Sequence, residues 1–234
     1  MDSLHFCIAV VPLSVYLLMM GLLNLRRHPF VTTGARDAAT LGIGVVGFVI
    51  AGPMELFFPE GAASQFGAWV WLSLIVFYGL CVSLVVLLMR PRLVVYNVAL
   101  EELRPILSKI AMELDPKSRW IGDALVIPRL KIHMHVEAVE LLRNVQMVAG
   151  GNQQSMEGWL RVERELKQHM AKVTVGPNVM GIPFLIASGL LAVTAATYLI
   201  LDGEAVRVAW NNFCLLYTSP SPRDRTRSRM PSSA

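Results

Sequence analysis

Charged side chains are scarce in this sequence. Asp, Glu, Lys and Arg make up only 16% of its 234 residues, whereas soluble domains carry about 25%. The hydrophobic share of 54% and the mean hydropathy of +0.52 agree with this scarcity. The composition argues against an ordinary soluble enzyme, and its apolar content excludes a disordered or collagen-like chain.

Cysteine is also rare, and no nucleotide-binding pattern is present. Three cysteines in a chain of this length do not form a disulfide framework. Gly150-Gly151 is followed neither by a Gly-Lys-Ser/Thr ending nor by the spaced glycines of a dinucleotide fingerprint. We interpret these glycines as a strand-to-helix turn in which glycine supplies a positive φ. The sequence therefore predicts no bound cofactor.

Four apolar runs are long enough to cross a bilayer, which takes roughly 20 residues. The second run contains one charged residue, Glu55, and the other three contain no Lys, Arg, Asp or Glu. Glu55 lies near the end of its run and is expected to reach the headgroup layer. Because no Lys or Arg precedes the first run, we interpret it as a retained span and not as a cleaved signal peptide. The predicted spans cover residues 4–25, 38–58, 68–89 and 178–201.

The positive charges indicate the orientation of these spans. They follow the first and third runs, whereas residues 59–67 between the second and third contain no Lys or Arg. Since Lys and Arg concentrate in cytoplasmic loops, we expect both ends of residues 1–213 to lie outside. The sequence thus predicts a multi-pass protein of the bacterial cytoplasmic membrane, with the lipid bilayer as its first partner. The arginines concerned are Arg26, Arg27, Arg36, Arg90 and Arg92.

Residues 90–176 have a different character and are predicted to form a small cytoplasmic α/β domain between the third and fourth spans. They contain 13 Lys and Arg and 10 Asp and Glu. One helix is expected over residues 99–114, and Ser155 is expected to cap a second. The order β-α-β-β-β-α favours a largely antiparallel sheet with helices on one face. Strands are predicted at residues 93–98, 120–127, 129–137 and 144–149.

The third predicted strand carries the only candidates for a metal site, His133 and His135. Residues two apart on a strand point to one side, so Arg129, Lys131 and Glu137 are expected on the same solvated face. A zinc site needs three or four ligands, and same-face neighbours lie about 6.6 Å apart without converging. We therefore favour a polar sheet face over a metal site, and no catalytic set is predicted elsewhere.

Small residues are spaced four apart in two of the predicted spans. Such stripes let helix backbones approach closely. Each is predicted to be a packing face toward another span, a membrane or cytoplasmic protein partner, or a second copy of the chain. The residues are Ala38, Gly42, Gly47 and Ala51 in the second span, and Ser188, Ala192 and Ala196 in the fourth.

Residues 214–234 differ sharply from the rest of the chain. Residues 214–224 resemble a translated transposase-type sequencing adapter, and residues 228–234 resemble the adjoining flow-cell adapter in the same frame. We expect this tail to be an artefact and the native C-terminal sequence to be missing. Without its four arginines and one aspartate the formal charge falls from +4 to +1. No nucleic-acid partner is predicted.

These observations predict a non-catalytic interaction or regulatory component of a membrane assembly, acting through residues 90–176. The alternative is a membrane enzyme that acts on a lipid or lipid-linked substrate. In that case Arg129, Lys131, His133 and His135 are the first residues to test. A small transporter or channel subunit is disfavoured, because the predicted spans carry almost no charge.

Overall fold

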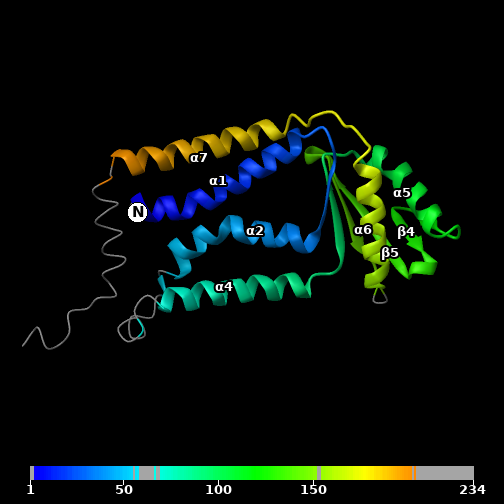
Figure 1. Ribbon diagram of the computed structural model, residues 1–234, viewed down its shortest axis with the longest axis horizontal. Coiled ribbons are helices and arrows are strands. Elements are labelled where there is room, and N and C mark those ends of the chain that lie inside the picture. The colour runs from blue at the N-terminus through cyan, green and yellow to red at the C-terminus, as the bar shows by residue number, and fades with distance from the viewer. Residues whose placement is uncertain are drawn as a thin grey trace, which may run out of the picture.

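The computed structural model describes residues 3–54, 56–57, 66, 69–151, 154–201 and 203. Within them the chain is mostly helical, with four helices long and apolar enough to cross a membrane and a small antiparallel sheet. In Figure 1 the four helices lie roughly parallel, and the sheet occupies one end of the molecule. Glu55, most of the predicted loop 59–67 and the tail 214–234 lie outside the described residues.

The four long helices form a row in the order α7, α1, α2, α4. Helix α1 packs against both α7 and α2, and α2 packs against α4. Successive helices run in opposite directions, so α1 and α4 end, and α2 and α7 begin, beside the sheet (Figure 1). Their bounds are Ser3–Leu25 for α1, Gly34–Val49 for α2, Trp69–Leu88 for α4 and Gly181–Leu201 for α7, and a π-helical turn η1 (Ile50–Met54) extends α2.

The sheet has six antiparallel strands in the order β1-β2-β6-β5-β4-β3. Helix α5 (Leu100–Leu114) and helix α6 (Met156–Met170) follow β2 and β6 in the chain. We call the sheet with α5 and α6 the sheet domain. The strands are β1 (Phe30–Thr33), β2 (Arg92–Tyr96), β3 (Arg119–Ile121), β4 (Ala124–Ile127), β5 (Ile132–Val139) and β6 (Asn144–Ala149).

The sheet differs from the predicted one at three places. Strand β1 comes from the connection between α1 and α2, where no strand was expected, and it pairs with β2. The predicted strand 120–127 is a hairpin, because Gly122 adopts a φ of 61° and turns the chain between β3 and β4.

The predicted strand 129–137 begins only at Ile132. Residues Pro128–Leu130 form a 3₁₀ turn, and Lys131 has a left-handed φ of 52°. Proline cannot donate to a strand ladder, and the left-handed residue reorients the chain. The expectation that Arg129 and Lys131 share the strand face of the histidines is therefore wrong.

The two faces of the sheet have different neighbours. The inner face packs against α5 and α6 in one buried core that includes Leu103, Leu107, Trp159 and Leu166. The Ser155 hydroxyl accepts a hydrogen bond from the Gly158 N–H at 3.2 Å, which confirms the predicted cap of α6. The outer face is contacted by α1 only near β2. There Val94 and Tyr96 form a second buried cluster with Met20, Tyr16, Met19 and Leu23.

Glycines allow the close approach of the long helices, as the small-residue pattern predicted. A Cβ on Gly47 would lie 2.1 Å from the carbonyl oxygen of Ile8 in α1. Gly42 faces α4 instead, and its carbonyl accepts a hydrogen bond from the Tyr78 hydroxyl at 2.7 Å. The two glycines therefore pack against different helices, on opposite sides of α2 in the row.

Of the predicted stripe in α7, Ser188 packs against another span of this chain. The Ser188 hydroxyl donates to the Ser14 carbonyl oxygen of α1 at 2.7 Å, whereas Ala192 and Ala196 are exposed. The buried positions are Gly181, Ser188 and Ala195. At 100° per residue, a seven-residue spacing stays on one side of a long, nearly parallel contact, whereas steps of four drift away from it.

We expect replacement of Gly47 by alanine to weaken the packing of α1 against α2. The new Cβ would meet backbone atoms that cannot rotate away, and overpacking typically costs about 1–3 kcal/mol of the free energy of unfolding. Reversible unfolding of the full chain in detergent, followed by circular dichroism, measures this loss. The control is Gly79→Ala on α4, where a Cβ meets nothing within 4 Å. Equal stability of the two variants would contradict the predicted contact.

Candidate functional site

A largely buried group of polar contacts lies where the long helices meet the outer face of the sheet. Asp37, in the first turn of α2, accepts a hydrogen bond from the Tyr96 hydroxyl of β2. Its other carboxylate oxygen lies 3.6 Å from the Arg92 guanidinium. Gly34 makes room for this arginine, since a Cβ there would lie 2.0 Å from the Arg92 Cγ. We call Asp37, Arg92 and Tyr96 the β2 clamp.

The β2 clamp is largely withdrawn from solvent. The side chains of Arg92 and Asp37 are 24% and 20% exposed, and Tyr96 is buried. Burial and, second, the hydrogen bond to Asp37 raise the pKa of the Tyr96 phenol above its usual range, so the hydroxyl remains a proton donor. The β2 clamp thus consists of the Asp37–Arg92 ion pair and the neutral Tyr96 hydroxyl, which donates a hydrogen bond to the same carboxylate.

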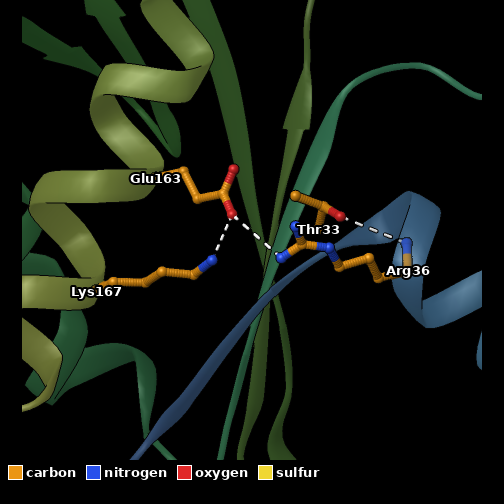
Figure 2. A network of polar contacts seen from close by, with 4 residues as sticks. All are labelled: Thr33, Arg36, Glu163 and Lys167. Carbon is orange, nitrogen blue, oxygen red and sulfur yellow. Dashed lines mark hydrogen bonds and ion pairs between the residues drawn. The ribbon is translucent and has the colours of Figure 1, made fainter.

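A second polar group ties α6 to the start of α2 around strand β1 (Figure 2). Glu163 accepts from the Lys167 ammonium at 2.5 Å and lies 3.8 Å from the Arg36 guanidinium. Thr33 caps α2 by accepting from the Arg36 N–H at 3.4 Å. Glu163 is 12% exposed and Arg36 is 70% exposed. Since an exposed pair contributes little energy, this contact orients α6 more than it stabilises it.

A third set of contacts joins the exit of α1 to the entry of α7. These contacts use backbone groups of the two connecting segments and the side chain of Asn97, which has a left-handed φ of 59°. Together they join the connection that follows α1 to the connection that precedes α7. The contacts run from Asn97 Nδ2 to the Arg26 oxygen (2.6 Å), from the Val175 N–H to the Arg27 oxygen (2.8 Å) and from the Asn178 N–H to the Asn24 oxygen (2.9 Å).

His133 and His135 lie exposed on the outer face of β5, as the alternating pattern predicted. His135 pairs with Val148 in β6, and Val148 pairs with Arg92 in β2. One cross-strand row therefore leads from His135 to the β2 clamp. Within the part of the chain that the structure describes, no group of three His, Cys, Asp or Glu side chains is placed to hold a metal ion.

The two glycines before α6 form the turn expected from the sequence. Gly151 has a φ of 82°, which glycine adopts readily. The Gln154 side chain closes the turn by donating to the carbonyl oxygens of Gly150 and His133. The same side chain accepts from the Trp159 indole at 3.0 Å. The Gln154 side chain thus fixes the start of α6 against β5.

No protein-family model, curated protein or solved structure matches the chain. The roles of its residues therefore rest on their geometry alone.

The sequence pattern did not indicate the β2 clamp. Asp37 and Tyr96 are 59 positions apart, and neither belongs to a spaced motif. One local signal was present, since Asp37 is a carboxylate in the first turn of an apolar helix, where the helix dipole favours it. Its partners became visible only with the pairing of β1 and β2, which brings the start of α2 over the sheet.

We expect Tyr96→Phe to lower the free energy of unfolding by about 1.5–3 kcal/mol, the usual range for a hydrogen bond to a charged group. The substitution removes the donor to Asp37 and keeps the aromatic ring in its cluster. Denaturant titration of the full chain in detergent measures the loss. Phe30, which is 38% exposed and pairs with Tyr96, offers a control in Phe30→Leu. A Tyr96→Phe variant as stable as this control would contradict the role of the hydroxyl.

The pH dependence of stability gives a separate test of the same contact. Because the folded pKa of Tyr96 is raised, its contribution is present below the unfolded pKa of about 10 and is lost as pH rises above that value. The wild-type protein should therefore lose more stability above about pH 10 than Tyr96→Phe does. Unfolding measured across this pH range, with tyrosinate absorbance as a second readout, tests whether the pKa of Tyr96 is raised. Parallel pH profiles would exclude the raised pKa.

We expect Glu163→Gln to loosen α6 relative to α2 with a loss of stability below about 1 kcal/mol, as for exposed ion pairs. Spin labels at Leu41→Cys and Leu160→Cys, in a chain without its native cysteines, report the distance between the two helices. The distribution should broaden in Glu163→Gln. It should stay unchanged in the control Glu157→Gln, whose ion pair with Arg161 lies within α6. Equal distributions in both variants would contradict the orienting role.

Proposed function

We propose that this protein is a non-catalytic component of a membrane assembly, anchored by α1, α2, α4 and α7 and acting through its sheet domain in the cytoplasm. Four helices of spanning length support the anchoring. Large apolar side chains such as Leu84, Leu88 and Ile200 are more than half exposed, as suits contact with lipid. The orientation is supported by Arg26, Arg27, Arg36 and Arg90, which lie at or near the helix ends beside the sheet domain.

The observation that carries this proposal is the way the sheet domain is joined to the helices. A strand from the connection between α1 and α2 is built into the sheet, and Val31 of that strand lies in the inner core. The β2 clamp and the Arg36–Glu163 pair add contacts on both sides of the same strand pair. A partner bound to the sheet domain would therefore act directly on α1 and α2. This close attachment of the sheet domain to α1 and α2 suits a docking or regulatory component.

The free part of the outer sheet face is the surface we propose for partner binding. His133, His135 and Glu137 are exposed along β5, and the row through His135 and Val148 leads back to Arg92. The face thus combines hydrogen-bond donors, hydrogen-bond acceptors and short apolar side chains. Such a mixture occurs in non-obligate protein–protein interfaces.

A photo-crosslinking amino acid in place of His135 tests the proposal in the full chain in its own membranes. We expect a discrete adduct of higher mass from this position. The same amino acid in place of Met112, a 63% exposed residue of α5 on the other side of the sheet, serves as the control. Adduct formation should fall when Glu137 is replaced by lysine. The adduct's protein content is then identified by mass spectrometry.

Two outcomes would contradict this function. One is a chain that forms no adduct from position 135 and is recovered only as a monomer after gentle solubilisation. The other is a lipid or lipid-linked product whose formation by the purified chain is lost in His133→Ala or His135→Ala while folding is unchanged. That second result would favour the enzyme hypothesis, with the same face of β5 as its site.

A further inference from the structure

One corner of the sheet domain exposes apolar side chains beside the exit of α1. Val139, the last residue of β5, is 41% exposed, and Leu141 in the following 3₁₀ turn is 67% exposed. Large apolar side chains grouped at one place on a domain surface indicate a contact with a partner or a membrane. The position of Val139 and Leu141 relative to the long helices indicates whether this contact is with a partner or with a membrane.

The strand register places Val139 on the face that the long helices contact. Val139 pairs with Asn144. The pairing of Val95 with Val145 brings Asn144 opposite Tyr96 at the next position. Residues that face each other across antiparallel strands project from the same side of the sheet, and neighbouring strands lie about 4.8 Å apart. Val139 therefore lies about 10 Å from Tyr96, in the same row and pointing to the same side.

Hydrogen bonds fix the following turn close to the ends of α1 and α7. The Arg143 carbonyl oxygen accepts from the Val98 N–H at 2.7 Å, and the neighbouring Asn97 side chain donates to the Arg26 oxygen. The Arg143 guanidinium lies 3.5 Å from the Gly176 oxygen, a few residues before α7. Leu141 is thus held at the level where α1 ends and the connection to α7 begins.

The charges beside this corner match an anionic surface. Arg26 and Arg27 are exposed, and neither guanidinium forms an ion pair with any residue that the structure describes. Arg143 is paired with Glu102. Glu140 is the opposing charge in the turn, and the two free arginines outweigh it. Apolar side chains next to free cations are the combination by which peripheral segments bind anionic bilayers.

We propose that Val139 and Leu141 insert into the headgroup layer of the membrane that holds the long helices, while Arg26 and Arg27 bind its anionic phospholipids. We call these four residues the lipid-binding corner. This inference rests on the proposed insertion of the helices in a bilayer. It adds a second attachment that fixes the tilt of the sheet domain, in addition to the β2 clamp.

Spin labelling of the full chain in liposomes tests the corner. The three cysteines of the chain are replaced by serine, and a nitroxide is placed at Leu141→Cys or at the control Met156→Cys. These two positions are similarly exposed, at 67% and 64%. Relaxation by oxygen, which concentrates in the bilayer, is compared with relaxation by a water-soluble nickel chelate. In liposomes of phosphatidylcholine with phosphatidylglycerol, only the label at position 141 should be shielded from nickel and accessible to oxygen.

The lipid dependence tests the role of the arginines. A basic residue near an anionic surface contributes about fivefold to binding. In anionic liposomes, some protein molecules have the lipid-binding corner inserted and others have it in water. Arg26→Gln and Arg27→Gln should each lower the ratio of the first to the second by about fivefold. In liposomes of phosphatidylcholine alone the two substitutions should have little effect. An effect of the same size in both kinds of liposome would contradict the binding of anionic phospholipid.

Two further results would overturn the proposed insertion of Val139 and Leu141 into the headgroup layer. One is a label at position 141 that is as accessible to nickel as the label at Met156→Cys. The other is shielding of position 141 from both reagents, because this indicates cover by protein. A label at Leu84→Cys on α4, which is 57% exposed, separates these results from a failure of membrane insertion. If that label also lacks access to oxygen, the proposed anchoring is wrong and not only the corner.

Discussion

The burial of strand β2 on both faces is the constraint on which the rest of the structure depends. Leu93 and Val95 point into the core beneath α5 and α6, while Val94 and Tyr96 point toward α1. These side chains are at most 7% exposed. A strand with no solvated face must have neighbours on both sides, so the sheet cannot separate from the long helices without exposing apolar surface. The position of the sheet domain follows from this one strand, and the polar contacts around Asp37 refine it.

The periodic features of the chain could be predicted from the sequence, and the long-range ones could not. The apolar runs correspond to the four long helices, because twenty uninterrupted apolar residues leave few alternatives. The alternation along β5 correctly placed His133 and His135 on a solvated face. Strand β1 was missed, since Phe30–Thr33 is too short to show a period and becomes a strand only by pairing with β2. The clamp at Asp37 was missed for the same reason: its partners are brought together by that pairing.

The junction is also where polar groups are least well satisfied. Four buried side-chain atoms of the described residues have no hydrogen-bond partner, and all four lie at this boundary: Asn24 Oδ1, Arg92 Nε, Asn97 Oδ1 and Asn178 Nδ2. An unsatisfied buried polar atom costs about 1–3 kcal/mol, whereas the inner core of the sheet domain carries no such cost. Among the described residues, the buried polar side-chain atoms without a partner thus gather at the boundary between the sheet domain and the long helices.

The outer sheet face divides into two parts with different neighbours, and the division follows the strand order. Strands β1 and β2 lie against α2 and α1, whereas β5 and the two strands beyond it have no contact of comparable extent with the long helices. The same face thus provides an internal joint at one edge and a free surface at the other. Cross-strand rows connect them, because Arg92, Val148 and His135 are consecutive partners. A ligand that changed the charge or spacing at His135 would act on a row that ends at the Asp37–Arg92 ion pair. This geometry makes the sheet itself the physical link between the free surface along β5 and the helices that we propose to cross the membrane.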